Sequence, residues 1–281
     1  MTRTAARSET GRVREDNEDR YVVHESRGTL LLAVADGVGG SAGGEVAANA
    51  AVVELADRFF AATADRAIEE RLTDAIRDAN TAVLHAAEAS GNGDAATTIV
   101  AAAITGDRAI IANLGDSRAY LVRDGQPRQL TEDHHAERSA AITRFAGDPR
   151  GVQPDVFVED LRPGDRLVLC SDGLTRHVDA SEIATLAADA EPGQATDALV
   201  ELALSRGGED NVTVVVHTVA PEPRFAMPSR RALALGMVVA VAVLIVATAA
   251  ILLFANAPFA PTPAPSVSPT PSASPTPTVS P

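Results

Sequence analysis

The stretch LLLAVADG at residues 30–37 ends an uninterrupted apolar run on a carboxylate followed by a glycine. A short apolar run bounded by a turn is typical of a buried β-strand, so we expect a strand from Leu30 to Ala35. Asp36 then directly follows a fully apolar segment, where an ionised side chain needs a compensating partner. The position of Asp36 therefore indicates a role beyond turn formation.

The same arrangement occurs at several points along the chain, where an aspartate begins or ends an expected strand. The members are Asp19, Asp36, Asp172 and Asp210, with Asp116 in a Gly-Asp-Ser turn as a candidate fifth. Asp-Gly and Gly-Asp pairs are common in turns, and for any single aspartate a turn is the simpler interpretation. The repetition of the pattern favours a shared site.

A cluster of this kind is suited to hard divalent cations, which take oxygen ligands. With few histidines nearby and a single cysteine, Mg²⁺ or Mn²⁺ is favoured over Zn²⁺. Two bridged cations suit phosphate ester hydrolysis, because they generate hydroxide near neutral pH and offset charge on the phosphoryl oxygens. Arg14 could supply a bidentate contact to the phosphate, although its spacing is equally compatible with a surface arginine.

The composition excludes several other functions. The chain has 281 residues, a formal charge of −14 and no lysine, all 24 basic residues being arginine. Schiff-base catalysis, a Walker P-loop and a protein kinase each need a lysine. An acidic domain repels nucleic acid, so no nucleic-acid partner is expected. The single cysteine, Cys170, excludes an intrachain disulfide framework, and the polar N-terminus does not resemble a signal peptide.

Residues 1–220 are expected to form an α+β domain, because the expected helices cluster instead of alternating strictly with strands. The expected strands are Arg20–Glu25, Leu30–Ala35, Thr97–Thr105, Arg108–Leu114, Arg118–Arg123, Arg166–Cys170 and Val212–Val219. The expected helices are Glu45–Phe60, Arg66–Ala89, Ser181–Ala188 and Gln194–Ser205.

The C-terminal part of the chain has a different composition. Residues 232–254 are apolar and uncharged, which is long enough for one transmembrane helix and longer than most buried core helices. Arg224, Arg230 and Arg231 precede this run and no basic residue follows it, which favours a cytoplasmic domain at 1–220. Residues 221–231 would be a juxtamembrane linker. The Pro/Ser/Thr-rich residues 255–281 would be a disordered tail outside the cell membrane.

The order of these motifs resembles the metal-dependent protein phosphatase family, the type 2C Ser/Thr phosphatases. Residues 11–19 and 34–40 resemble the opening of that family, and residues 115–118, 169–174 and 210–213 match its later motifs. The resemblance covers residues 4–219. The C-terminal helix and tail are similar to bacterial membrane-anchored members that oppose Ser/Thr kinases.

The resemblance implies a four-layer α-β-β-α sandwich of two antiparallel sheets, with two Mn²⁺ or Mg²⁺ ions and a third at a weaker position. The implied roles are metal ligation by Asp19, Asp36, Asp172, Asp210 and the carbonyl of Gly37, a third-metal contact at Asp116, a metal-bound water at Glu18, and phosphate binding at Arg14. The implied partners are phosphorylated proteins, among them membrane Ser/Thr kinases and their substrates, and the lipid bilayer.

Two positions depart from the family pattern. Val38 stands where some relatives carry a histidine that acts as general acid, so the proton donor to the leaving group is not identified. The flap that borders the cleft is short, spanning only Asp133 to Arg144. A short flap offers few contacts beyond the phosphoryl group, so little discrimination among peptide sequences is expected.

Three alternatives are open at this level. The chain could be a pseudophosphatase that acts as a membrane-tethered binding module. It could be a cytoplasmic phosphatase that acts on an anti-sigma-factor antagonist. Cys170 and Arg176 also have the Cys-x5-Arg spacing of thiol-dependent tyrosine phosphatases, although Asp172 in that loop would repel a phosphate dianion.

Overall fold

The computed structural model describes residues 3–38, 43–63, 65–91, 93–136, 141–220 and Thr248. One antiparallel sheet has the order β10-β7-β6-β3-β2, with β2 (Arg20–Ser26), β3 (Thr29–Ala35), β6 (Ile99–Thr105), β7 (Arg108–Leu114) and β10 (Asp155–Asp160). The other has the order β1-β12-β11-β8-β9, with β1 (Thr4–Glu9), β8 (Arg118–Arg123), β9 (Gln126–Gln129), β11 (Arg166–Cys170) and β12 (Val212–Thr218). A short ribbon pairs β4 (Gly37–Val38) with β5 (Ala96–Thr97).

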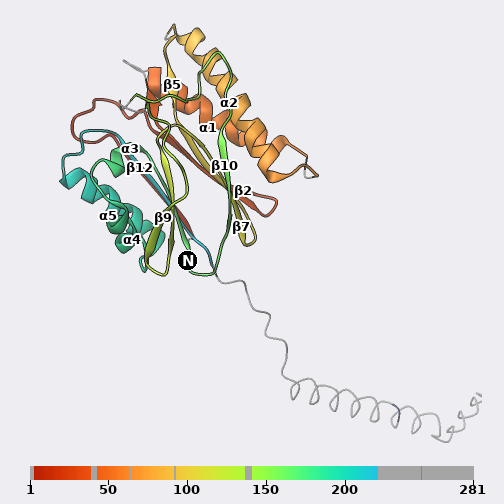
Figure 1. Cartoon of the computed structure of the whole chain (residues 1–281), viewed down its shortest axis with the longest axis vertical. Coiled ribbons are helices and arrows are strands. Elements are labelled where there is room, and N and C mark those ends of the chain that lie inside the picture. Colours follow the sequence, from red (N-terminus) through yellow and green to blue (C-terminus); the bar gives the residue numbers. More distant parts are fainter. Residues whose placement is uncertain are drawn as a thin grey trace, which may run out of the picture. The chain divides into compact units, whose positions relative to one another are not determined.

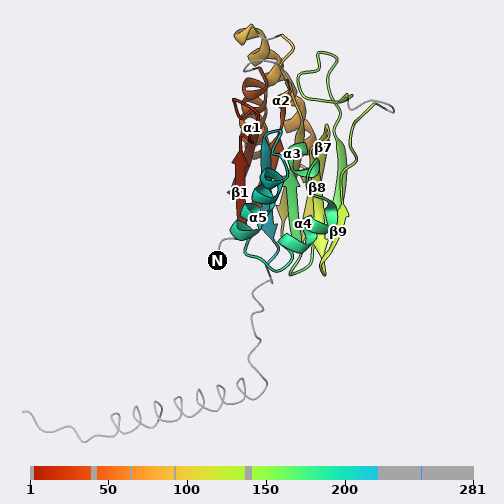
Figure 2. The same ribbon diagram turned by 90° about the vertical axis from the view of Figure 1, so that its left-hand side faces the viewer.

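Helices cover the outer face of each sheet, which gives four layers (Figure 1). Helices α1 (Gly43–Ala61) and α2 (Ile68–Ser90) pack on the sheet that contains β3. The other sheet, which contains β11, is packed against helices α3 (Asp172–Thr175), α4 (Ala180–Ala187) and α5 (Pro192–Ser205). Figure 2 looks onto the face covered by α4 and α5. The predicted α+β class and the α-β-β-α sandwich are therefore confirmed.

The apolar runs of the sequence are explained by burial on both faces of each sheet. In β3, Leu31 and Ala33 pack under α1 and α2, whereas Leu32 and Val34 pack between the two sheets. In β11, Leu167 and Leu169 likewise face the space between the sheets, whereas Val168 and Cys170 face the helices. Because successive side chains of a strand point to opposite faces, a strand buried on both sides has no polar alternation.

Several elements differ from the sequence prediction. Strands β1, β9 and β10 were not predicted, because their side chains are largely polar or half-exposed and do not form apolar runs. The single strand expected at 97–105 is interrupted at Thr98, whose backbone N–H donates to the carbonyl of Asp36. Helix α1 begins at Gly43, two residues earlier than expected, and α2 begins at Ile68, two residues later.

The predicted transmembrane segment 232–254 lies outside the described residues, apart from Thr248. In the part of the chain that the structure does describe, there is no helix with both the length and the apolar character needed to cross a bilayer. The linker at 221–231 and the tail at 255–281 also lie outside the described residues.

Candidate metal centre and active site

The topology brings the predicted aspartates to one end of the sandwich. Asp19 immediately precedes β2 and Asp36 immediately follows β3, and these antiparallel strands pair Arg20 with Ala35. Asp172 follows β11 and Asp210 precedes β12, and these strands pair Cys170 with Val214. Asp116 lies in the turn before β8, whose Arg118 pairs with Cys170. Strand ends that are far apart in sequence thus meet at the same end of the two sheets.

Hydrogen bonds hold the Asp19 side chain and the Asp36 backbone in place. The Asp19 carboxylate is buried, and its Oδ2 accepts a hydrogen bond of 2.7 Å from Ser171 Oγ. The backbone N–H of Asp36 donates to Thr98 Oγ1 at 3.0 Å, and the Asp36 carbonyl accepts from Thr97 Oγ1 at 2.9 Å. These contacts fix the end of β3 against β5 and β6.

Burial and mutual repulsion disfavour the ionised forms of Asp19, Asp36 and Asp172. Burial, followed by repulsion from Asp19, Asp172, Asp116 and Asp210, raises the pKa of Asp36 well above its usual value. Burial also raises the pKa of Asp19 to about 7, although Thr213 and Ser171 oppose the shift by hydrogen bonding. The pKa of Asp172 is raised by burial, against the opposing charge of Arg176. Cations beside these oxygens would offset the repulsion and favour the ionised forms.

Two buried oxygens support the same conclusion. Asp19 Oδ1 and Asp116 Oδ1 are buried without a hydrogen-bond partner among the residues that the structure describes. Buried carboxylate oxygens without a partner are costly, and a hard cation would satisfy them. The donor set is made of oxygens alone, which fits Mn²⁺ or Mg²⁺.

Two arginines also contact these carboxylates. Arg176 Nε donates to Asp172 Oδ2 at 3.0 Å, and Arg176 Nη1 lies 3.2 Å from Asp210 Oδ2. Arg14 Nη2 lies 2.8 Å from Asp210 Oδ1, and Arg14 Nη1 lies 3.9 Å from Glu18 Oε2. Within the described ranges, no three or more Asp, Glu, His or Cys side chains are arranged to hold a metal ion.

The contacts of Arg176 with Asp172 and Asp210 were not predicted, because this residue was considered only as part of the Cys-x5-Arg spacing. The signal that could have revealed the first of them is the spacing of four residues from Asp172, which places the two side chains on one face of a helical turn. Ser171 was also missed, because nothing in its sequence context distinguishes it from an ordinary turn serine.

Gly37 and Glu18 lie against the first turn of α1. A Cβ added to Gly37 would lie 2.4 Å from the carbonyl carbon and oxygen of Gly44, so only glycine permits this approach. The Glu18 backbone N–H donates to Asn211 Oδ1 at 2.8 Å. Burial raises the pKa of Glu18, and the charge of Arg14 and a hydrogen bond from the Gly44 backbone oppose the rise. The helix terminus thus borders the carboxylate cluster.

Asp116 is in contact with the flap. His135 Nε2 lies 2.9 Å from Asp116 Oδ2. The adjacent His134 has other partners: its Nδ1 accepts from the backbone N–H of Gly115 at 3.0 Å, and its Nε2 lies 2.9 Å from Asp155 Oδ2. The contact between His135 and Asp116 joins the flap to the carboxylate cluster and was not predicted.

The structure contradicts the cysteine-dependent alternative. Cys170 is completely buried on the helix-facing side of β11, in the core formed with α3, α4 and α5. Burial raises the pKa of the Cys170 thiol to about 12, so a thiolate is not available at neutral pH. Cys170 is a core residue.

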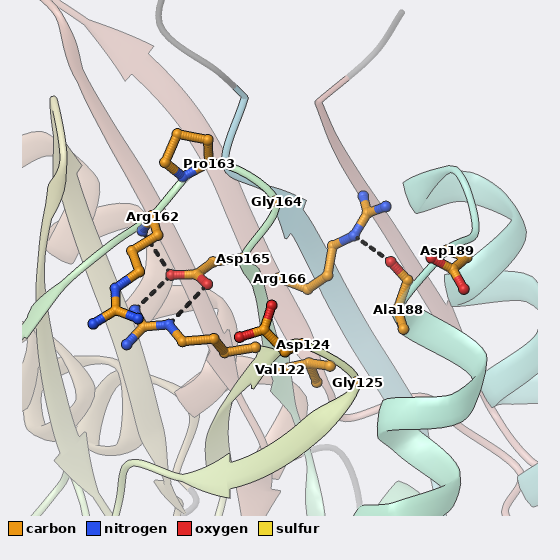
Figure 3. Close-up of a pocket in the computed structure, with 11 residues that line it drawn as sticks. Val122, Asp124, Gly125, Arg162, Pro163, Gly164, Asp165, Arg166, Ala188 and Asp189 are labelled. Atoms are coloured by element: carbon orange, nitrogen blue, oxygen red, sulfur yellow. Dashed lines mark hydrogen bonds and ion pairs between the residues drawn. The ribbon is translucent and has the colours of Figure 1, made fainter.

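A cavity of about 550 Å³ lies at the opposite end of the sandwich, and none of the predicted site residues lines it (Figure 3). Arg123, at the end of β8, pairs there with Asp165 across 2.7 Å. Arg166 Nε donates to the carbonyl of Ala188 at 3.1 Å. Because none of the clustered aspartates lines it, this cavity is not the candidate active site.

Comparison with solved structures identifies the class of fold. The Mycobacterium tuberculosis serine/threonine phosphatase PstP superposes with a TM-score of 0.70 at 34% identity, over 78% of this chain and 99% of that chain. The PstP catalytic domain in complex with two manganese ions gives a TM-score of 0.69 at 35% identity, over 78% and 98% of the two chains. The sandwich is therefore the fold of these solved serine/threonine phosphatases.

Sequence comparison identifies the family. Residues 6–203 match the profile of the Protein phosphatase 2C family. PstP of M. tuberculosis is 35% identical over 78% of this chain, and Stp of Listeria monocytogenes is 35% identical over 75% of it and 93% of its own length. The chain belongs to the protein phosphatase 2C family. It spans 45% of the length of the M. tuberculosis relative.

Proposed function

We propose that this chain is a metal-dependent protein phosphatase that hydrolyses phosphoserine and phosphothreonine in proteins. The observation that carries the proposal is the cluster of five aspartates at one end of the sandwich, with two buried carboxylate oxygens that lack partners among the described residues. Membership of the protein phosphatase 2C family, and a relative described in complex with two manganese ions, support the same activity.

The proposed ligands of two Mn²⁺ or Mg²⁺ ions are Asp19, Asp36, Asp172, Asp210 and the carbonyl of Gly37. Asp116 would contribute to a third position, and Glu18 would act through a water. The chemistry that such ions supply is a lowered pKa for water and neutralisation of phosphoryl charge. Arg176 contacts only Oδ2 of Asp172, so Oδ1 of that carboxylate would be the oxygen to bind a cation.

The protein side chains would then bind and orient the substrate. Arg14 is half-exposed at the rim of the cluster, where its guanidinium can turn from Asp210 to a phosphate dianion. A guanidinium fork matches two phosphate oxygens and so fixes the phosphorus for in-line attack. Ser171 and Thr98 would hold the Asp19 side chain and the Asp36 backbone in position throughout the reaction.

The activity itself can be tested with the full chain and a phosphothreonine peptide. We expect hydrolysis when Mn²⁺ is present and none when EDTA replaces it. Mn²⁺ binding without any hydrolysis would overturn the proposal in favour of the binding-module alternative.

Arg14→Ala is expected to raise KM about ten- to a hundredfold with a smaller change in kcat. The reason is the loss of a charge-assisted hydrogen bond to the phosphate, worth about 1.5–3 kcal/mol. Steady-state kinetics on the phosphopeptide measure the effect. The matched control is Arg12→Ala, an exposed arginine two residues away, which should leave KM unchanged. Equal KM values for the two variants would place Arg14 outside the substrate site.

We also propose that residues 232–254 anchor the protein in the cell membrane, with residues 1–220 in the cytoplasm, 221–231 as a linker and 255–281 outside. The support is the uncharged apolar run and the three arginines that precede it. Its substrates would be phosphorylated proteins at the same membrane surface, among them Ser/Thr kinases and their targets.

The topology makes a direct prediction. Protease added outside intact cells is expected to remove the tail at 255–281 and to leave residues 1–220 intact, because only the tail is accessible. Immunoblots with antibodies to each end of the chain measure the outcome. Degradation of the N-terminal domain under these conditions would reverse the orientation.

A further inference from the structure

An apolar pocket of about 670 Å³ opens beside the candidate metal centre. Its apolar lining consists mainly of Val38, Ala95, Ala96, Ile142, Phe145 and Pro149. Val38 is 42% exposed, and Ile142 and Phe145 are half-buried, whereas the adjacent Ala146 is completely buried in the core. Apolar side chains therefore meet solvent here instead of filling the core.

The pocket is continuous with the proposed site through the β4–β5 ribbon. Val38 pairs with Ala96, and the neighbouring Gly37, a proposed metal ligand, pairs with Thr97. The Thr97 hydroxyl donates to the carbonyl of Asp36 at 2.9 Å. Only Gly37 thus separates Val38 in the pocket lining from Asp36 in the carboxylate cluster.

The pocket wall that contains Ile142 and Phe145, at the end of the flap and just beyond it, is held in place by backbone hydrogen bonds. The Ala146 N–H donates to the Thr97 carbonyl at 2.8 Å, and the Thr97 N–H donates back at 3.0 Å. The Thr143 N–H donates to the carbonyl of His134 at 2.8 Å. Phe145 and Ile142 are therefore presented from fixed backbone, and such a surface can discriminate between ligands with little ordering cost.

We infer that this pocket binds an apolar side chain that directly flanks the phosphorylated residue of a protein substrate. An apolar side chain would bury its surface against Val38 and Phe145. A carboxylate would lose hydration without gaining a side-chain donor from the described lining residues, and it would face Asp94, which also lines the pocket. The inference rests on the proposed phosphatase activity and departs from the expectation that a short flap leaves the enzyme indifferent to peptide sequence.

The test compares phosphothreonine peptides that carry Leu, Ala or Asp immediately before or immediately after the phosphothreonine. For the full chain with Mn²⁺, kcat/KM is expected to be about tenfold higher for Leu than for Asp at one of the two positions. This ratio corresponds to about 1.4 kcal/mol.

Gly93→Leu provides the sharpest variant, because Gly93 lines the pocket and a Cβ there meets no atom within 4 Å. The added side chain should fill the pocket and reduce the Leu-to-Asp ratio to below about threefold. Gly193→Leu is the matched control, since Gly193 is also exposed with open space around its Cβ but lies on α5. It should leave the ratio unchanged.

Two further readouts separate this inference from the proposed function. Hydrolysis of p-nitrophenyl phosphate, which has no flanking residue, reports the activity alone and is expected to be equal in all three proteins. Fluorescence anisotropy with labelled peptides gives the Leu-to-Asp ratio of Kd values even when no turnover occurs. A ratio within twofold at both positions in the unmodified protein, or an unchanged ratio in Gly93→Leu, would overturn the inference.

Discussion

Asp36→Asn is expected to lower kcat for a phosphothreonine peptide by about a hundredfold or more. Divalent cations contribute several kcal/mol of transition-state stabilisation in phosphate ester hydrolysis, and each 1.36 kcal/mol is tenfold in rate. Asparagine keeps the shape of the side chain and removes the charge that would hold the cation. Because Asp36 lies among four other carboxylates, this loss is expected at the centre of the site. The kinetics are measured across a range of Mn²⁺ concentrations.

The control for this experiment is Cys170→Ala, which changes a buried core residue on β11, a strand of the facing sheet. This variant is expected to keep most of the activity, with EDTA abolishing it. Full activity of Asp36→Asn together with an inactive Cys170→Ala would contradict the metal-dependent mechanism.

The second large effect concerns stability and pH. The pKa values of Asp19, Asp36 and Asp172 are all raised in the folded chain. A carboxyl group with a raised folded pKa contributes stability that is complete below its unfolded pKa near 4. That contribution is lost as the pH rises through the folded pKa, which for Asp19 is about 7. The metal-free protein is therefore expected to be less stable at pH 8 than at pH 5.

Mn²⁺ is expected to reverse this loss, because it binds the ionised carboxylates. At a hundredfold excess over its Kd, one bound ion adds about 2.7 kcal/mol. In a domain of this size, this corresponds to a Tm increase of about 5–10 °C. The gain at pH 5 should be less than half of the gain at pH 8, since protons compete for the same oxygens.

Circular dichroism melts in EDTA and in Mn²⁺, at both pH values, measure the effect. Asp36→Asn in EDTA should have a Tm at pH 8 at least about 2 °C above that of the unmodified protein, because a source of repulsion is removed. An equal gain from Mn²⁺ at pH 5 and pH 8 would show that the ion does not bind these carboxylates.

The sequence predicted the positions of the aspartates because strand ends can be read from apolar runs. Residues 30–35 and 166–170 are buried on both faces, so their ends are marked by the first polar residue. Edge strands lack this signal. Strand β1 is half-exposed along its length and depends on pairing with β12, more than two hundred residues away in sequence.

Contacts between distant loops could not be predicted from spacing. The pairing of Arg176 with Asp210, the contact of His135 with Asp116 and the pocket between Val38 and Phe145 each join segments that meet only in the folded chain. The metal-ligand roles of the aspartates and the membrane segment at 232–254 stay predictions, which the experiments described above address.

The most direct test of the account is the number of Mn²⁺ ions bound per chain, measured by equilibrium dialysis at pH 7.5 alongside phosphopeptide hydrolysis. We expect at least two ions per chain, with activity rising as they bind. In Asp36→Asn, at least one ion should be lost together with the activity. Phosphopeptide hydrolysis by a chain that binds less than one ion, or unchanged metal binding in Asp36→Asn, would contradict the assignment of the carboxylate cluster as the catalytic metal centre.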